Sequence, residues 1–294
     1  MPELSYRSEL LAPSDTDRST WSGGFSTDQK SYSRLLRSAQ QLRARCYLAD
    51  GAIRPAQVCP DGRFAMPGDE DSWHFLLATS DDRVVGCVRY TVYDPCTVSF
   101  EQLRVGQLGR LTDRDWTRKL VTAVEADIRL ARDRGSLYAE LAGWAIDEEY
   151  RGTKLALETL VASYAWGGLL EGGCICSCTA TVRHGSASIL RRIGGRPMAT
   201  ANGALPPYWD SRYGCAMEVL RFDSRVVEPR YQRLIGDVQR NIQGKAAIQH
   251  DAISPELRFQ LSLANLSCAL NKGRGLVPDS ATFAQHVLAG RRQN

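Results

Sequence analysis

A strand that runs into a helix through a glycine-containing turn is the part of this sequence that points most directly to chemistry. Residues 137–156 read LYAELAGWAIDEEYRGTKLA. The apolar run 137–146 predicts a buried strand, and a helix is expected from Thr153. The first N–H groups of a helix have no partner within it and carry the positive end of its dipole, so this turn suits a phosphate or pyrophosphate. Arg151 would add a charge-assisted contact. An ordinary strand–helix connection has the same local pattern.

The elements around this motif alternate in an order that predicts a mixed α/β (α+β) fold. Strands that come first and then alternate with helices predict a mixed central sheet with helices on its faces. Helical spacing is expected over residues 29–49, 113–132, 153–170 and 184–193, and strands over 73–79, 84–93, 137–146, 174–182 and 213–222. A long loop rich in Gly, Pro and Asp, residues 50–71, is a candidate binding loop.

Composition divides the chain into three parts. Residues 1–28 are rich in Ser, Thr, Asp and Gly and predict a flexible N-terminal arm. Residues 29–224 hold the predicted α/β domain. Residues 225–294 combine helical stretches with a Gly-broken, basic tail and predict a helical C-terminal extension, which would cover the acceptor site, mediate a homodimer or do neither.

The overall composition excludes several classes of protein. The chain has 294 residues, 43% hydrophobic and 24% charged, as in an ordinary globular protein. We expect no membrane span and no secretory signal. Nine cysteines scattered through apolar segments indicate a reducing, cytoplasmic environment. A net charge of +4 without a basic, aromatic-interleaved stripe argues against nucleic-acid binding.

Three cysteines, Cys174, Cys176 and Cys178, alternate along one predicted strand and therefore share a face. Metal ligands usually come from tight turns, so we expect no metal site. Packing beside a helix or an acyl chain is the favoured interpretation. A nucleophilic pair of a cysteine with His184 is the alternative.

From Gln29 to Asp223 the order of elements resembles the GNAT acyltransferase superfamily. Members bind the phosphate of their donor on a turn written Arg/Gln-x-x-Gly-x-Gly/Ala. Here residues 151–156 read RGTKLA, with Lys154 in place of the middle glycine. The family's thiolate-protonating Tyr is Leu190 in this chain. The resemblance implies a GNAT-like sheet flanked by helices and a donor site made by Ile146, Arg151, Gly152, Thr153, Lys154, Leu155 and Ala156.

A narrower resemblance is to acyl-homoserine-lactone synthases and N-acyl amino acid synthases, which take fatty acyl groups from acyl carrier protein. Their central strand reads Glu-x-x-Arg-aromatic-x-Val, and residues 140–146 read ELAGWAI, with Gly143 at the arginine position. Three further motifs match in part and in the same order. They are Arg-x-x-x-Phe at Arg43 and Tyr47, the acidic loop at residues 69–74 (DEDSWH), and Gly-x-x-Arg-Leu at residues 86–90 (GCVRY).

The chemistry of amide formation then suggests roles. The attacking amine must be neutral, and desolvation on a buried strand would tune Glu140 as its general base. The alternative is a structural carboxylate paired with Arg89 or Arg43. Backbone N–H groups around Trp144 and Ala145 are expected to stabilise the oxyanion of the thioester carbonyl. His184 would protonate the leaving thiolate.

The acceptor site implied by the resemblance is a salt-bridge network. Its residues are Arg43, Tyr47, Asp69, Asp71 and Arg89. Simple solvation of the acidic loop is the alternative. An apolar pocket for the acyl chain is expected among Trp144, Leu160, Tyr164, Ile175 and Met198.

Together these features predict a cytoplasmic N-acyltransferase that moves an acyl group, expected to be a fatty acyl group, from a phosphopantetheine thioester to the amine of a small acceptor such as an amino acid. The donor would be acyl carrier protein or acyl-CoA, with no tightly bound cofactor. Basic residues near the donor turn would dock an acidic carrier protein: Arg151, Lys154, Arg191, Arg192 and Arg196. The alternatives are a coenzyme A-dependent acetyltransferase of a small amine and a GNAT-shaped binding module without activity.

Overall fold

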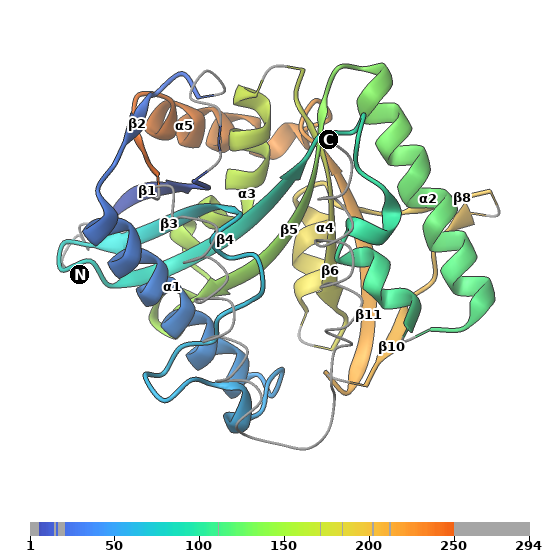
Figure 1. Cartoon of the computed structure of the whole chain (residues 1–294), viewed down its shortest axis with the longest axis horizontal. Helices are drawn as coiled ribbons and strands as arrows, with labels where there is room; N and C mark the ends of the chain where they lie inside the picture. Colours follow the sequence, from blue (N-terminus) through green and yellow to red (C-terminus); the bar gives the residue numbers. More distant parts are fainter. Residues whose placement is uncertain are drawn as a thin grey trace, which may run out of the picture. The chain divides into compact units, whose positions relative to one another are not determined.

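The computed structural model describes residues 6–14, 16, 21–110, 112–170, 172–183, 185–201, 203–211 and 213–249, and these all belong to one compact unit, Met1–Ile253. A large mixed sheet runs through this unit, with helices on both of its faces (Figure 1). The predicted class, a mixed central sheet flanked by helices, is confirmed.

The sheet has the strand order β10-β11-β6-β5-β4-β3-β1-β12-β2, with β7 also paired to β11. Its pairs are antiparallel except for β5 with β6, β1 with β12 and β12 with β2. The strands are β1 (Tyr6–Ala12), β2 (Phe25–Ser26), β3 (Trp73–Thr79), β4 (Val84–Tyr93), β5 (Leu137–Ile146), β6 (Cys174–Thr181), β7 (Arg196–Pro197), β10 (Tyr208–Asp210), β11 (Cys215–Asp223) and β12 (Ala247–Gln249). A separate small hairpin consists of β8 (Ala199–Thr200) and β9 (Gly203–Ala204).

Helices on opposite faces pack against different parts of the sheet. The helices are α1 (Gln29–Ala49), α2 (Arg114–Asp133), α3 (Lys154–Leu169), α4 (Ser186–Arg192) and α5 (Gln232–Gln243). One face is covered by α1 over β3 and β4 and by α2 over β5 and β6, and the other face by α3, α4 and α5 (Figure 1). Because β3 is covered on both faces, six of its seven residues are buried rather than alternating.

Local sequence fixes where the two long helices on the first face begin. Asp28 and Asp113 are their N-caps, and their carboxylates accept the backbone N–H of Ser31 at 3.0 Å and of Trp116 at 2.8 Å. Apolar residues at helical spacing, such as Trp116 and Leu120, then face the sheet.

The terminal segments differ from the sequence-based expectation. The flexible arm predicted for residues 1–28 is wrong over Tyr6–Ala12, which pairs with β3 from Tyr6↔Thr79 to Leu11↔His74. Leu10 and Leu11 are buried on opposite faces of the sheet, in a strand that lies between β3 and β12, so this short run outweighs the polar composition around it. The extension predicted for residues 225–294 contains α5 as expected, but also β12, which pairs with β1 and β2. Its remainder lies outside the described residues, and the boundaries at 28 and 224 stay predictions.

Candidate active site

The central strand β5 carries a bulge and then separates from β6. Between Cys87 and Arg89 the pairing of β4 with β5 shifts register, so that Gly143 and Trp144 together lie opposite Val88. Gly143 adopts a φ of +65°, a conformation that glycine tolerates best. The parallel pairing of β5 with β6 runs from Leu137↔Cys174 to Leu141↔Cys178. Beyond those residues the two strands are not paired, so the C-terminal half of β5 has no strand partner on the side of β6; we call this interruption of the sheet the gap.

The bulge also changes the face of the sheet on which the even-numbered side chains of β5 lie. Before it, Glu140 lies on the face of α1 and α2, the same face as Tyr138. After it, Trp144 and Ile146 pack against the α3 side and Ala145 against the α1 side. A regular strand would have placed these three even-numbered residues, Glu140, Trp144 and Ile146, on one face.

Backbone groups of Trp144 and Ile146 turn away from β4. The Asp147 N–H points toward β4, where it donates to the Val85 carbonyl at 2.9 Å. Backbone polar groups of successive residues in a strand point to alternate sides, so those of Ile146 and Trp144 point away from β4. In agreement, the Trp144 carbonyl accepts from the Tyr47 hydroxyl and the Ile146 carbonyl accepts from the Cys46 thiol, both at 3.2 Å. This alternation favours Trp144 and Ile146, rather than the predicted Ala145, as backbone N–H donors toward the gap.

The turn after β5 presents an uncapped helix N-terminus. A 3-10 turn (Glu148–Tyr150) leads to Gly152, whose φ is +75°. Thr153 occupies the N-cap position, but its hydroxyl donates to the Tyr150 carbonyl at 2.6 Å instead of accepting a helix N–H. The first turn of α3 contains no acidic residue, and residues 151–154 are exposed. This geometry leaves the first N–H groups of the helix available to an anion.

Two cations flank that turn, and each has an acidic neighbour. Arg151 lies 3.6 Å from Asp50, and Lys154 lies 3.2 Å from Glu158. The side chains of Arg151, Asp50 and Lys154 are exposed, and only Glu158 is mostly buried. Exposed ion pairs are weak, so a phosphate group can compete with the carboxylates for both cations.

Glu140 is buried and tied to a loop. Its carboxylate accepts the Tyr93 hydroxyl at 2.8 Å and the backbone N–H groups of Arg104 at 2.9 Å and Val105 at 2.8 Å. Burial and the neighbouring Glu140 raise the pKa of Tyr93, which keeps its hydroxyl a donor. Glu140 therefore anchors the segment that holds two 3-10 turns (Phe100–Gln102 and Val105–Arg110), and the alternative pairing with Arg43 or Arg89 is not what the structure has.

Asp69 stands at the centre of a buried cluster on the α1 face. It accepts from Arg43 (2.9 Å to Nη1), Arg89 (2.7 Å to Nη1), Gln40 (3.0 Å) and the Met66 N–H (3.0 Å). Burial raises the pKa of Asp69, but the two guanidinium groups outweigh it and hold that pKa well below its usual range.

His74 completes the cluster as a neutral group. Its Nε2 donates to the backbone carbonyl of Asp69 at 2.7 Å. Burial lowers the pKa of His74 to about 4, with the nearby arginines acting in the same direction, so the ring carries no charge near neutral pH.

The cluster has a net positive charge, because two arginines share one aspartate. Arg43 and Arg89 are each only 1% exposed, yet they share the single carboxylate of Asp69. Arg43 Nε, Arg89 Nε and Arg89 Nη2 have no hydrogen-bond partner among the residues that the structure describes. Buried, unpaired guanidinium donors are costly, so this cluster lowers the stability of the fold unless a further acceptor reaches it.

Gly143 brings this cluster against the β5 bulge. A Cβ atom at residue 143 would lie 3.0 Å from Arg43 Nη1, so the Arg43 guanidinium occupies the space beside the strand. Arg43 belongs to α1, so a guanidinium group from this helix lies beside the strand at Gly143.

Other predicted site residues lie where they cannot join this arrangement, or outside the described residues. Asp71 is exposed, and the ion pairs of Arg43 and Arg89 go to Asp69. His184 lies outside the described residues. Of the expected acyl-pocket residues, Leu160 and Tyr164 pack on the α3 face, whereas Ile175 and Met198 pack on the α2 face, so those five residues do not line one pocket. Arg191 is paired with Glu218 at 2.8 Å.

The alternating cysteines behave as their spacing indicates. Cys174, Cys176 and Cys178 are buried on the α3 face, and the Sγ atoms of the first two lie 3.5 Å apart. Within the described ranges, no group of three or more His, Cys, Asp and Glu residues is arranged to hold a metal ion. Across those same ranges, no helix is long and apolar enough to cross a membrane.

Comparisons with known proteins found similar chains only among solved structures. No protein-family model matches the sequence, and no curated protein matches it. The chain is similar to the coenzyme A-dependent acyl-homoserine lactone synthase BjaI (14% identity, TM-score 0.49, covering 87% of this chain and 100% of BjaI) and to the synthase LasI (14%, 0.45, 83% and 98%). It is also similar to FeeM, an N-acyl amino acid synthase from uncultured soil microbes (10%, 0.44, 75% and 92%). These are the families that the sequence motifs named, and at such identities the likeness concerns the fold alone.

Proposed function

We propose that this chain is an N-acyltransferase that moves an acyl group from a phosphopantetheine thioester to the amine of a small acceptor bearing a carboxylate, such as an amino acid. One observation carries the proposal. A buried pair of arginines, Arg43 and Arg89, has surplus positive charge and unpartnered donors, and it lies against the bulge of β5.

The donor side of the proposal uses β5 and α3. The phosphate of the donor would lie on the turn from Arg151 to Ala156, facing the uncapped N-terminus of α3. From there the pantetheine arm would enter the gap where β5 leaves β6. The N–H groups of Trp144 and Ile146 would then face the thioester carbonyl and stabilise the oxyanion as it forms.

The acceptor side uses the α1 face of the same strand. The acceptor carboxylate would take the free donors of Arg89 and Arg43, as a guanidinium binds a carboxylate through paired N–H groups. This places the acceptor amine beside residues 143 and 144, next to the proposed carbonyl position. Asp69 keeps both guanidinium groups in place.

The proposed reaction is a direct displacement. The amine nitrogen attacks the thioester carbonyl carbon, a C–N bond forms, the C–S bond breaks and the thiolate leaves. The proton lost by the amine goes to Glu140, which lies diagonally across from Arg89 on the same face of the sheet. A carboxylate has about four acceptor sites, and three donors hold Glu140, so one site remains for that proton.

The test is a thiol-release assay with identification of the product. The full chain is mixed with acetyl-, octanoyl- or palmitoyl-CoA, or with the corresponding acyl carrier proteins, and with a mixture of amino acids. The proposal expects thiol release that depends on an amino acid, and a product whose mass is that of the N-acylated acid. The decarboxylated amines of the same amino acids serve as matched controls and should react far more slowly.

Two outcomes separate this function from its alternatives. Release that is equally fast with decarboxylated amines would indicate an acetyltransferase of simple amines and contradict the acceptor assignment. Thermal stabilisation by donors without any thiol release would indicate a binding module. The choice between coenzyme A and carrier protein turns on Lys154, because Lys154→Gly should leave coenzyme A esters poor substrates if a carrier protein is the donor.

A further inference from the structure

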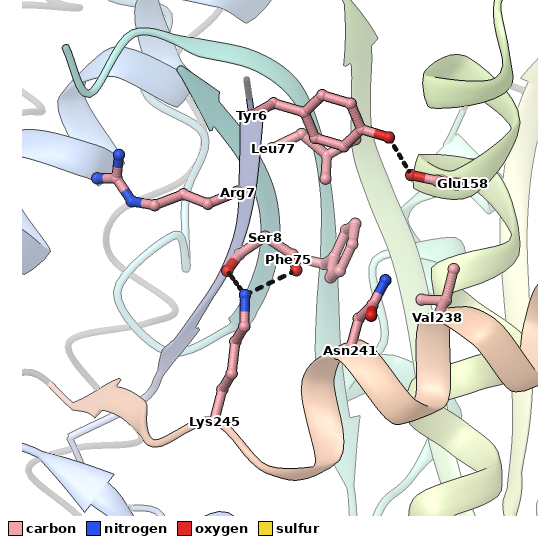
Figure 2. A pocket seen from close by; sticks show the side chains of 9 residues that line it. All are labelled: Tyr6, Arg7, Ser8, Phe75, Leu77, Glu158, Val238, Asn241 and Lys245. Atoms are coloured by element: carbon pink, nitrogen blue, oxygen red, sulfur yellow. Dashed lines mark hydrogen bonds between the residues drawn. The ribbon is translucent and has the colours of Figure 1, made fainter. Parts of the chain in front are cut away.

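Figure 2 shows a hollow of about 230 Å³ beside α3 and α5. These helices cover the face of the sheet opposite to α1 and the Arg43–Asp69–Arg89 cluster. The hollow is open to solvent on one side and is bordered by residues of β1, β3, α3 and α5 and by Lys245. Its lining residues are Tyr6, Arg7, Ser8, Phe75, Leu77, Glu158, Val238, Asn241 and Lys245. A water molecule accounts for roughly 30 Å³ of liquid, so the hollow has room for a small molecule rather than for isolated waters.

The hollow has an anionic end at Glu158. This side chain is only 10% exposed and comes from the second turn of α3. It accepts the Tyr6 hydroxyl at 3.0 Å and faces Lys154 at 3.2 Å. Burial and the adjacent Glu158 raise the pKa of Tyr6 to about 12, so Tyr6 remains a donor. Of about four acceptor sites on the carboxylate, two remain for a ligand.

The hollow has a cationic end at Lys245, held by β1. The ammonium group donates to the Ser8 carbonyl at 2.9 Å and to the Ser8 hydroxyl at 3.2 Å, as Figure 2 shows. An ammonium group has three donors, so one remains for an anion. The backbone of Lys245 is fixed as well, because its carbonyl accepts the Trp21 indole N–H at 3.0 Å.

Apolar surface and one free amide lie between the two charged ends. Phe75 and Leu77 of β3 and Val238 of α5 supply the apolar wall. The Asn241 amide projects among them in Figure 2 and makes no hydrogen bond to any residue that the structure describes. Opposite charges separated by an apolar wall with a free amide are the complement of a zwitterion.

We propose that this hollow is a second ligand site, which binds a small zwitterion carrying an ammonium group, a short aliphatic segment and a carboxylate. The ligand ammonium pairs with Glu158, its carboxylate takes the third donor of Lys245, and Asn241 bonds to either polar end. The site is separated by the sheet from the proposed acceptor cluster and does not require it, while its Glu158 also pairs with Lys154 of the proposed donor turn.

Calorimetric titration of the full chain tests this site with a graded set of probes. The probes are glycine, β-alanine, 4-aminobutyrate and 6-aminohexanoate, which share both charges and differ in the aliphatic segment. Butylamine and butyrate each keep one charge and serve as controls. We expect at least one zwitterion to bind, with butylamine and butyrate binding at least tenfold more weakly, because each lacks one charge-assisted hydrogen bond.

Variants locate the binding. Lys245→Met and Glu158→Gln should each weaken it roughly tenfold or more, whereas the exposed controls Arg240→Met and Glu149→Gln should leave it unchanged. Lys245 is exposed, so its variant is expected to fold even if Glu158→Gln does not. Binding that survives Lys245→Met but disappears in Arg89→Lys belongs to the acceptor cluster and overturns the proposal. Failure of all four zwitterions to bind overturns it as well.

Discussion

The surplus charge of the buried arginine cluster leads to an unusual prediction about stability. Asp69 is 4% exposed and is the only carboxylate that the structure pairs with Arg43 and Arg89. Asp69→Asn leaves two buried guanidinium groups without a counter-charge. Removing one partner of a buried ion pair typically costs about 3–5 kcal/mol of unfolding free energy, and both arginines are affected here.

Arg89→Met perturbs the same cluster in the opposite electrostatic direction. It removes two hydrogen bonds, to Asp69 at 2.7 Å and to the Pro67 carbonyl at 3.2 Å. It also removes two unpartnered nitrogen atoms, Nε and Nη2, and leaves Arg43 with Asp69 as a neutral pair. Replacing excess buried charge by an apolar side chain is often close to neutral. We expect a loss below about 2 kcal/mol, against about 3–5 kcal/mol for Asp69→Asn.

Urea denaturation at pH 7 measures both variants, and thermal melting provides a second measure. For a domain of this size each 1 kcal/mol shifts the melting temperature by about 2–4 °C, so Asp69→Asn should melt about 10 °C lower and Arg89→Met only a few degrees lower. Arg89→Met should nevertheless abolish acylation of acids. If Arg89→Met is at least as destabilising as Asp69→Asn, the cluster has no surplus charge and the anion-binding interpretation fails.

Three further predictions concern neighbouring residues. Glu140→Gln should lower turnover by roughly 10²-fold, as loss of a general base does. Tyr93→Phe removes one hydrogen bond to the Glu140 carboxylate and should lower turnover by less. Equal losses of turnover in the two variants would indicate that Glu140 only anchors the loop. The folded-state pKa of His74, about 4, lies below its ordinary value of 6.5, so between these pH values the unfolded chain binds one more proton than the folded chain. The free energy of unfolding should therefore fall as the pH drops from about 6.5 to 4. His74→Gln should flatten that slope, measured by urea denaturation at a series of pH values. The Cβ atom added by Gly152→Ala meets no atom within 4 Å, so this variant should cost only about 1 kcal/mol of backbone strain. The Cβ atom added by Gly143→Ala also presses on Arg43, so this variant should raise the KM for the acceptor in steady-state kinetics. An unchanged KM would show that the bulge does not belong to the acceptor site.

Strong apolar patterns made most of the fold predictable. The helix at residues 29–49 and the strands at 73–79, 84–93 and 137–146 have the predicted bounds, because their periodicity and flanking turns are unambiguous. The strand Tyr6–Ala12 was missed because its few apolar residues lie within a polar stretch. Its partner β3 supplies the hydrogen bonds, and nothing in the local sequence reports that pairing.

The candidate site was predictable only in part. Arg43, Asp69 and Arg89 were expected to meet because of the family resemblance, and the structure brings them together. The reversal of faces at Gly143 was not predictable, because an isolated glycine suggests a bulge without giving its register.

The partners of Glu140 were missed for a different reason. Two of them are the backbone N–H groups of Arg104 and Val105, where a short 3-10 turn begins, and such turns have no periodic pattern. Gln40 could have been found, since it lies one helical turn before Arg43 on the same face of α1.

The most direct test of the central claim is the competition between an amino acid and its decarboxylated amine for a single acyl donor. The full chain is supplied with one donor, octanoyl-CoA or octanoyl-acyl carrier protein, and an equimolar mixture of the two amines, and the products are quantified by mass spectrometry. Our account predicts that the N-acyl amino acid dominates and that this preference disappears in Arg89→Met. Equal acylation of both amines, or a preference unchanged in Arg89→Met, would contradict it.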